Sequence, residues 1–464
     1  MREKPLRVVI VRHGESTFNI EKRIQGRSDQ AVLTNHGQTQ AQAVAQALAP
    51  LPIHLAFSSP LQRAQRTAQI ILAERDGIPF VSTDLLREID LTAWEGLTFA
   101  EVKQKFPEDH QRWRYHPHLL SLHQRYPVVD LWQQAQDFWT YLGQEMEKIS
   151  PNGDEESDPS PMTILVVGHS GINRALIGAS TGIHCQHYHR FGQDNCALSI
   201  LNFPHGLNHP AQLESLNLTH HLGDPLPQSK GGLRLLLVRH GETQWNREQR
   251  FQGQKDIPLN ATGEEQAQQV GAFLASQSID LAFSSPLLRP WATAMAICQQ
   301  HASQLGSPLD LVPLPDLQEI CHGEWEGKLQ REIEAEYPGL LEQWQQAPAT
   351  VDMPCGENLQ QVWQRAQQAW NTILEKSAQT LANPSAESPH LTTLVVAHDA
   401  INKAILCQLF DRSPEAFWLF KQGNGAVTVI DYPEGAEGFP VLRCLNITSH
   451  LTGGVLDSTA AGAL

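Results

Sequence analysis

The chain has 464 residues and a formal net charge of −16, from 50 acidic and 34 basic side chains. This balance argues against nucleic acid or an anionic membrane surface as the main partner, because both favour a basic protein face. The seven cysteines are scattered without a Cys-x-x-Cys spacing, which favours reduced thiols over disulfides or a zinc site. With no signal peptide or membrane span in its first residues, the chain is predicted to be cytoplasmic.

Three segments in the first half share one form, an aliphatic or aromatic run that breaks into polar residues. Residues 8–11 lead into Arg12-His13-Gly14-Glu15, and the later segments are Phe57-Ser58-Ser59-Pro60-Leu61 and Val166-Val167-Gly168-His169. Such runs are typical of buried parallel strands, and ligands bind beyond the carboxyl ends of such strands. Helical stretches such as residues 41–49 lie between them. The pattern predicts an α/β fold, a sandwich of helices around a mostly parallel central sheet.

The same three segments return in the second half. They are Arg239-His240-Gly241-Glu242, Phe283-Ser284-Ser285-Pro286-Leu287 and Val395-Val396-Ala397-His398. His13 and His240 are 227 positions apart, and His169 and His398 are 229 apart, so insertions between the copies are small. The sequence therefore predicts two tandem α/β/α domains.

The predicted limits follow from the repeat and from local composition. They are residues 1–222 and 233–451 for the domains, 223–232 for a linker and 452–464 for a flexible tail. Before its last predicted strand each copy carries a polar insert, residues 150–161 and residues 383–389, which is predicted to be an exposed, mobile loop.

Three helix starts are predicted from side chains that can cap them. Thr262-x-x-Glu265 matches a capping box, and Ser170 and Asp399, which follow His169 and His398, are good N-cap residues. A second hypothesis for Asp399 is that its carboxylate lies close enough to a bound phosphate to repel it and weaken the second site.

Further polar residues recur in the same order in both copies. They are Asn19, Gln25, Gly26, Arg63 and Glu88 in the first copy and Asn246, Gln252, Gly253, Arg289 and Glu319 in the second. A single Arg-His-Gly is often a coincidence, but an ordered set of companions found twice is a strong signal. On these motifs, both halves resemble the histidine phosphatase superfamily, also called the phosphoglycerate mutase-like family, over nearly their full length.

The resemblance implies a phosphatase that works through a phosphohistidine intermediate and needs no metal or other cofactor. The implied catalytic residues are His13, Glu88 and His169 in the first copy and His240, Glu319 and His398 in the second. The implied phosphate-binding residues are Arg12, Asn19, Gln25, Gly26 and Arg63 in the first copy and Arg239, Asn246, Gln252, Gly253 and Arg289 in the second. Among them, His13 and His240 would be the nucleophiles, and Glu88 and Glu319 the general acids.

These residue types suit phosphoryl transfer on physical grounds as well. A neutral imidazole is nucleophilic near pH 7, and its phosphoramidate can be hydrolysed in a second step. Guanidinium groups and a protonated second histidine can meet the charge that spreads over the equatorial oxygens. A nearby phosphate dianion would raise the pKa of a glutamate that must protonate the leaving alkoxide.

Two further groups of histidines are candidate metal ligands. They are His116, His118 and His123, and His184, His187 and His189. Neither group has acidic or cysteine partners at a recognised ligand spacing, so surface or pocket-rim histidines are the prediction.

The two copies differ between the glutamate and the last strand. Residues 101–126 contain five basic and three acidic side chains, whereas residues 328–353 contain two basic and five acidic ones. The first approach is thus predicted to suit a strongly anionic substrate better, although such an excess can also mark a solvated face. The second copy has Pro354-Cys355-Gly356-Glu357-Asn358, close to the usual family segment, and the first copy departs from it.

Within the family, the first half resembles the 2-carboxy-D-arabinitol-1-phosphate phosphatases of plants and cyanobacteria, through Tyr126-Pro127-Val128, residues 23–26 and residues 86–91. This resemblance implies a small-molecule sugar phosphate substrate, with 2-carboxy-D-arabinitol 1-phosphate or related inhibitors of Rubisco favoured. Two alternatives stay open, a phosphoglycerate mutase and a pairing of one catalytic domain with one regulatory domain that binds a phosphorylated ligand. No phosphate-loop motif marks a kinase half.

Overall fold

The computed structural model describes residues 5–149, 161–224, 226–382 and 390–454, together with residues 456 and 459. The chain forms two compact units, Met1–Pro227 and Gln228–Leu464, so the division falls within the segment expected to be a linker. The predicted polar inserts and most of the predicted tail lie outside the described residues.

The first unit is a sheet of six strands with helices packed against it. Its strands are β1 (Leu6–Arg12), β2 (Leu55–Ser58), β3 (Phe80–Ser82), β4 (Met162–Gly168), β5 (Leu198–Phe203) and β6 (Gln212–Leu218). Its α-helices are α1 (Thr17–Ile20), α2 (Asn35–Leu48), α3 (Gln62–Leu72), α4 (Phe99–Lys105), α5 (Pro107–Tyr115), α6 (Pro127–Ile149) and α7 (Ser170–Thr181). Short 3-10 helices are η1 (Asp84–Leu86), η2 (Pro117–Leu119), η3 (Cys185–Arg190) and η4 (His220–Leu222).

The strand order β3-β2-β4-β1-β5-β6 brings the polar ends of three strands to one edge. β1, β2, β3 and β4 run parallel, β5 is antiparallel to β1, and β6 is antiparallel to β5. His13, Ser59 and His169 directly follow β1, β2 and β4, so they meet at the carboxyl edge. On the faces of the sheet, α6 packs against α7 and α2 packs against α3.

The second unit repeats this plan. Its strands are β7 (Gly232–Arg239), β8 (Leu281–Ser284), β9 (Leu311–Pro313), β10 (His390–Ala397), β11 (Val427–Tyr432) and β12 (Val441–Ile447). Its α-helices are α8 (Gln244–Arg247), α9 (Ala261–Leu274), α10 (Leu288–Leu305), α11 (Gln330–Glu336), α12 (Leu340–Gln346), α13 (Leu359–Leu381), α14 (Asp399–Gln408) and α15 (Ser449–Thr452). Short 3-10 helices are η5 (Pro315–Leu317), η6 (Gly323–Trp325), η7 (Pro348–Thr350) and η8 (Pro414–Ala416).

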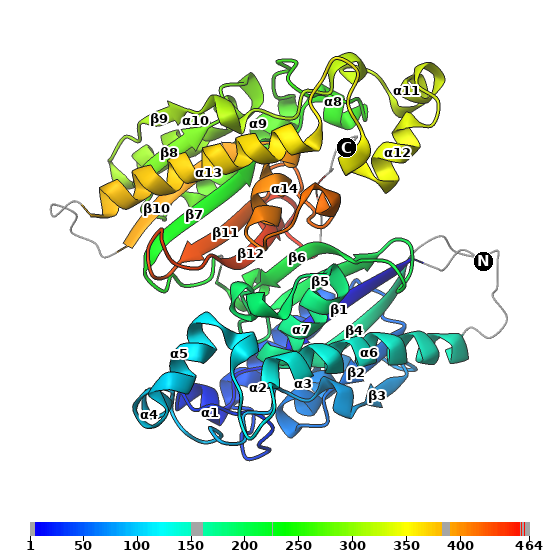
Figure 1. Ribbon diagram of the computed structural model, residues 1–464, viewed down its shortest axis with the longest axis vertical. Coiled ribbons are helices and arrows are strands. Elements are labelled where there is room, and N and C mark those ends of the chain that lie inside the picture. Colours follow the sequence, from blue (N-terminus) through cyan, green and yellow to red (C-terminus); the bar gives the residue numbers. More distant parts are fainter. Residues whose placement is uncertain are drawn as a thin grey trace. The chain divides into compact units, whose positions relative to one another are not determined.

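The second sheet has the order β9-β8-β10-β7-β11-β12, with β7, β8, β9 and β10 parallel and β11 antiparallel to both of its neighbours. Figure 1 shows α13 running along this sheet, and the sequence explains why it packs there. Val362, Ala366, Ala369 and Ile373 recur at helical spacing and are buried. The prediction of two tandem α/β domains with mostly parallel sheets is therefore confirmed.

One predicted helix start is wrong. α9 begins at Ala261, and the side chain of Asn260, not Thr262, caps it by accepting a hydrogen bond from the Gly263 N–H at 2.9 Å. Thr262 lies inside the first turn, where its hydroxyl accepts a hydrogen bond from Arg247 at 2.5 Å. Asparagine is as good an N-cap as threonine, so Asn260, two residues before Thr262, takes the role.

The predicted N-caps after the second histidines are also wrong. α7 begins at Ser170 and α14 begins at Asp399, so the N-cap positions are His169 and His398, whose side chains make no capping bond. A carboxylate from another segment caps each helix instead, as the site shows below. No helix in the described part of the chain is both long and apolar enough to cross a membrane.

Candidate active site

The first histidine of each copy is held in one tautomer. The Nδ1–H of His13 donates to the Gly14 carbonyl at 2.7 Å, and the Nδ1–H of His240 donates to the Gly241 carbonyl at 2.7 Å. A carbonyl oxygen can only accept, so Nε2 of each neutral ring keeps its lone pair. Both side chains are buried, and each therefore presents a fixed nucleophilic nitrogen to the carboxyl edge of its sheet.

The second histidine of each copy lies beside the first. The ring centroids of His13 and His169 are 5.1 Å apart, and those of His240 and His398 are also 5.1 Å apart. Nε2 of His169 is 2.8 Å from the Ser59 hydroxyl, and Nε2 of His398 is 2.9 Å from Ser285. Both serines belong to the repeated Ser-Ser-Pro-Leu segment, which is the sequence signal for them.

The surroundings of all four histidines favour the neutral ring. Burial, and then the nearby guanidinium of Arg63, lower the pKa of His13 and of His169 well below 6.5. Burial and Arg289 have the same effect on the pKa of His240 and of His398. The protonated second histidine expected from the sequence therefore requires the charge of a phosphate dianion next to it.

Two arginines flank each first histidine and also hold the surrounding loops. Nη1 of Arg12 donates to the Gln193 carbonyl, and Nη1 of Arg239 donates to the Gln422 carbonyl, both at 2.6 Å. Arg63 donates to the carbonyls of Gly26 (2.9 Å) and Ser28 (2.7 Å), and Arg289 donates to those of Gly253 (2.7 Å) and Lys255 (3.0 Å).

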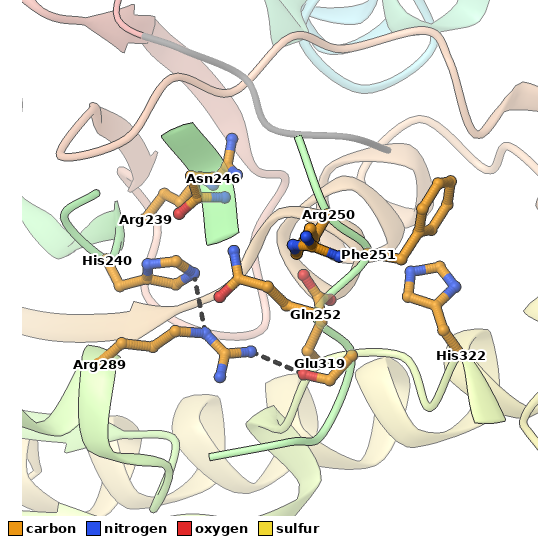
Figure 2. A pocket seen from close by; sticks show the side chains of 10 residues that line it. Arg239, His240, Asn246, Arg250, Phe251, Gln252, Arg289, Glu319 and His322 are labelled. Atoms are coloured by element: carbon orange, nitrogen blue, oxygen red, sulfur yellow. Dashed lines mark hydrogen bonds between the residues drawn. The ribbon is translucent and has the colours of Figure 1, made fainter. Parts of the chain in front are cut away.

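In the second unit, Arg289 also reaches the nucleophile. Its Nε donates to His240 Nε2 at 3.3 Å (Figure 2). This contact brings the positive charge of Arg289 next to the nitrogen atom that is predicted to attack phosphorus.

The loop that carries Gln25 and Gly26 needs a glycine at its centre. Gly26 and Gly253 have φ values of +49° and +59°, which favour glycine, and a Cβ on either would overlap the carboxylate of Glu95 or Glu326. Glu95 accepts a hydrogen bond from the Arg27 N–H at 2.6 Å and thus fixes the loop. This glutamate belongs to a Trp-Glu-Gly motif that recurs in both copies, as Trp94-Glu95-Gly96 and Trp325-Glu326-Gly327.

The asparagines of each copy are oriented by a second asparagine. Oδ1 of Asn19 accepts from the Ser16 N–H at 3.0 Å, and Oδ1 of Asn246 accepts from the Thr243 N–H at 3.1 Å. Asn195 donates to the His13 carbonyl (2.9 Å) and to Asn19 (3.3 Å).

Asn424 does the same for the second unit, where it donates to the His240 carbonyl (3.2 Å) and to Asn246 (3.4 Å). Sequence reasoning missed Asn195 and Asn424. Their signal was the repeat of Gln193-Asp194-Asn195 as Gln422-Gly423-Asn424, 229 positions later.

The two glutamates cap the helices that follow the second histidines. Glu88 accepts hydrogen bonds from the Gly171 and Ile172 N–H groups, both at 3.0 Å. Glu319 accepts from the Ala400 N–H at 3.0 Å and the Ile401 N–H at 3.4 Å. The glutamate, the helix N-terminus and the second histidine are thereby held in one cluster, although they are far apart in the sequence.

In both units an arginine donates a hydrogen bond to the backbone carbonyl of the glutamate, but the two arginines come from different elements. In the first unit Arg27, from the loop, donates to the Glu88 carbonyl (3.0 Å) and to Gln134 of α6 (2.8 Å). In the second unit Arg365, from α13, donates to the Glu319 carbonyl (3.3 Å), and the loop position is Gln254. The backbone carbonyl of each glutamate thus accepts a hydrogen bond from an arginine, but this arginine comes from a different element in each unit.

The acidic residue near the first arginine also comes from a different position in each unit. Asp399 is 1% exposed; its Oδ2 is 2.7 Å from Lys403 Nζ, and its Oδ1 is 3.8 Å from Arg239 Nη1. In the first unit, burial lowers the pKa of Arg12 and the charge of Asp194 opposes that shift. The position equivalent to Asp194 in the second unit is Gly423. Asp194 and Asp399 therefore each lie near the first arginine of their own unit, and Asp399 is ion-paired with Lys403.

The second unit has a pocket at this cluster (Figure 2). Its lining residues are Arg239, His240, Asn246, Arg250, Phe251, Gln252, Gly253, Arg289, Glu319 and His322. The structure thus brings together the predicted His240, Glu319, Arg239, Asn246, Gln252, Gly253 and Arg289, with His398 beside His240. Within the described ranges, no three His, Cys, Asp or Glu side chains are grouped so that they could hold a metal ion.

The basic excess predicted near the first site is partly neutralised. Arg112 pairs with Asp109 at 3.1 Å, and Arg125 pairs with Asp130 at 3.0 Å. Both arginines are more than half exposed, which limits their pull on an anion.

Buried neutral histidines make stability depend on pH. Burial lowers the pKa of His322 to about 3, so between pH 3 and 6.5 the unfolded chain binds a proton that the folded chain does not. Stability is therefore lost as pH falls below 6.5, by about 2 kcal/mol for such a histidine at pH 5. The unfolding free energy of the wild type should fall between pH 7 and pH 5 partly because of His322. We expect this fall to be about 2 kcal/mol smaller in His322→Leu, as measured by urea titrations at the two pH values. Equal losses in both proteins would contradict the assignment.

The chain matches one protein family twice. The histidine phosphatase superfamily (branch 1) matches residues 8–216 and again residues 235–447. The chain is 33% identical over 456 residues to 2-carboxy-D-arabinitol-1-phosphatase of Triticum aestivum, covering 96% of this chain and 86% of the relative. It is 29% identical over 463 residues to probable 2-carboxy-D-arabinitol-1-phosphatase of Arabidopsis thaliana, covering 97% and 89%.

A shorter relative matches about half of the chain. Phosphoserine phosphatase 1 of Hydrogenobacter thermophilus is 32% identical over 219 residues, which cover 47% of this chain and 94% of the relative. The duplicated family match and the phosphatases that resemble the whole chain agree with the paired histidine sites, and the chain belongs to the histidine phosphatase superfamily as a phosphoric monoester hydrolase with two tandem domains of that family.

Proposed function

We propose that the protein is a sugar-phosphate phosphatase in which both domains hydrolyse phosphate monoesters through a phosphohistidine. The observation that carries this proposal is the matched geometry of His13 with His169 and of His240 with His398, each pair 5.1 Å apart with the first ring held in the nucleophilic tautomer. The relatives that align over nearly the whole chain support 2-carboxy-D-arabinitol 1-phosphate as the favoured substrate.

In the first step, Nε2 of His13 attacks phosphorus, and the bond from phosphorus to the ester oxygen breaks. Arg12, Arg63, Asn19 and a His169 protonated next to the dianion stabilise the charge on the three equatorial oxygens. The leaving oxygen takes a proton from a carboxylic acid, and we assign that transfer to Glu88. His240, Arg239, Arg289, Asn246, His398 and Glu319 take the same roles in the second domain.

In the second step, water attacks the phosphohistidine and releases inorganic phosphate. The glutamate, now a carboxylate, accepts a proton from the water, and the histidine leaves as a neutral ring. In the second domain, the N–H groups of Ile320 and Ala400 donate hydrogen bonds to Glu319, and these bonds lower its pKa in opposition to burial. A bound phosphate dianion favours the acid form that the first step requires, so substrate binding supports protonation of the glutamate.

Hydrolysis in both domains is favoured over a purely regulatory second domain. The negative charge of Asp399 is paired with Lys403, and the first unit carries Asp194 in a comparable electrostatic role near Arg12. Burial and then Asp399 raise the pKa of Glu319, which assists a general acid. We therefore assign Asp399 to tuning the acid and not to weakening phosphate binding.

Asp399→Ser, which introduces the first unit's residue, tests this assignment. Without Asp399 the pKa of Glu319 falls, so the protonated acid is lost at a lower pH and the basic limb of kcat moves to lower pH. The variant also leaves Lys403 buried without its carboxylate, at a cost of about 3 kcal/mol or more in unfolding free energy. Both effects are measured in a His13→Ala background, which isolates the second site.

The double variant Asp399→Ser/Lys403→Met is the matched control for stability. It removes the unpaired charge and is expected to regain most of the lost stability, while the shifted basic limb of kcat remains. An unchanged pH profile in both variants would contradict a tuning role for Asp399.

The substrate assignment is tested by phosphate release from 2-carboxy-D-arabinitol 1-phosphate, D-arabinitol 1-phosphate and 3-phosphoglycerate. Hydrolysis of the first with the highest kcat/KM is expected. Equal or better hydrolysis of the others would leave the phosphatase in place and remove the favoured substrate. Isomerised phosphoglycerate with little free phosphate would instead indicate a mutase.

A further inference from the structure

The second pocket contains a buried polar side chain that the proposed mechanism does not use. His322 follows Glu319 by three residues, lines the pocket beside Phe251 (Figure 2) and is 0% exposed. Neither of its ring nitrogens has a hydrogen-bond partner among the residues that the structure describes. A buried imidazole in this condition is unfavourable unless a partner arrives from the pocket.

Aromatic rings enclose the rest of this imidazole. The ring centroid of Phe251 lies 5.2 Å from that of His322, and the ring of Trp344 lies 6.0 Å away, both edge-to-face. Phe251 in turn packs against Trp325 at 5.5 Å. Burial keeps the imidazole neutral, with one N–H donor and one acceptor. A hydroxyl group, which both donates and accepts, matches this ring better than a charged partner does.

The first unit offers different chemistry at the same place. The residue three positions after Glu88 is Leu91, which is 4% exposed, and Ile24 occupies the position of Phe251. The polar atom near the first glutamate is instead the hydroxyl of Tyr188, since a Cβ on Gly171 would touch both Glu88 and Tyr188. The two units therefore differ in the side chain three residues after the glutamate, which is Leu91 in the first unit and His322 in the second.

We propose that His322 binds a hydroxyl group of the leaving alcohol and makes the second site selective for phosphate esters of polyols. The proposal rests on hydrolysis by the second domain. It assigns His322 a role in specificity and leaves attack and proton transfer to His240 and Glu319. The first site, with Leu91, gains nothing from a hydroxyl at that position, so the two domains differ in their preference among leaving groups.

The test compares D-arabinitol 1-phosphate with n-pentyl phosphate, which has the same chain length without hydroxyl groups. In a His13→Ala background, His322→Leu is expected to lower kcat/KM about tenfold for the polyol ester and to leave the alkyl ester within about twofold. His322→Gln, which keeps a neutral donor and acceptor, is expected to recover part of the loss. In a His240→Ala background, His322→Leu should change neither ester.

Each outcome decides the proposal. A selective loss with the polyol ester supports it. Equal losses for both esters, or no loss for either, would overturn the hydroxyl subsite while hydrolysis by the second domain stands. If the His13→Ala protein hydrolyses neither ester, the second catalytic site fails and the subsite fails with it.

Discussion

Replacing His13 and His240 together with alanine is expected to lower kcat for phosphate release by at least about 10⁴-fold, because both nucleophiles are lost. Each single variant should retain the activity of the other domain and lose only its own. Steady-state kinetics on the sugar-phosphate panel measure the three proteins side by side. The exposed His36 provides a control, since His36→Ala should leave kcat unchanged.

Residual activity of the double variant near the wild-type level would show that another group attacks phosphorus. Loss of all activity in one single variant would show that only that domain turns substrate over. Because His13 and His240 are held in the same tautomer, we expect neither result.

Arg63→Lys and Arg289→Lys are expected to lower kcat/KM of their own domain by about 10²- to 10³-fold. Lysine keeps the charge but lacks the planar fork that spans two loop carbonyls, at Gly26 and Ser28 in the first unit. The loop that carries Gln25 then loses the hydrogen bonds that hold it, and the phosphate loses a hydrogen-bond donor. The measurement is made for each domain in the background in which the other nucleophile is alanine.

The loss should appear mainly in kcat for Arg289→Lys, because Arg289 also contacts the attacking nitrogen of His240. The exposed Arg112 supplies a control, and Arg112→Lys should have no effect above about twofold. An Arg63→Lys protein with wild-type kcat/KM would contradict the role of the guanidinium fork.

Local sequence patterns predicted the parts of the site that depend on strand ends. His13 and His169 follow buried aliphatic runs, and such runs reveal both the strands and the edge at which their polar ends meet. The duplication strengthened each assignment, since every landmark could be tested against its copy. For the same reason Asn195 and Ser59 could have been found, because they also recur.

Contacts between distant segments could not be predicted in the same way. Glu88 caps a helix that begins more than 80 residues later, and this removes the need for the local N-cap that Ser170 had suggested. Arg27 and Arg365 brace equivalent glutamates from different elements, so an alignment of the two copies shows a mismatch where the structure shows one guanidinium in each. Compensation of this kind is visible only when the segments are placed in space.

The pairing of Asp399 illustrates the same limit. From the sequence, its carboxylate could cap a helix or repel phosphate, and both ideas treat it as a local charge. Its partners are Lys403, one helical turn later in α14, and Arg239, the last residue of β7. Burial makes these partners decisive, because an unpaired carboxylate at 1% exposure would be strongly unfavourable.

The central claim, a phosphohistidine in each domain, is tested most directly by rapid acid-free quenching of the wild-type protein during turnover of a radiolabelled phosphate ester, followed by peptide mapping. The account predicts acid-labile, alkali-stable label on the peptide with His13 and on the peptide with His240, and each His→Ala variant should lose one of the two labels. Label on neither histidine, or on one alone in the wild type, would contradict it.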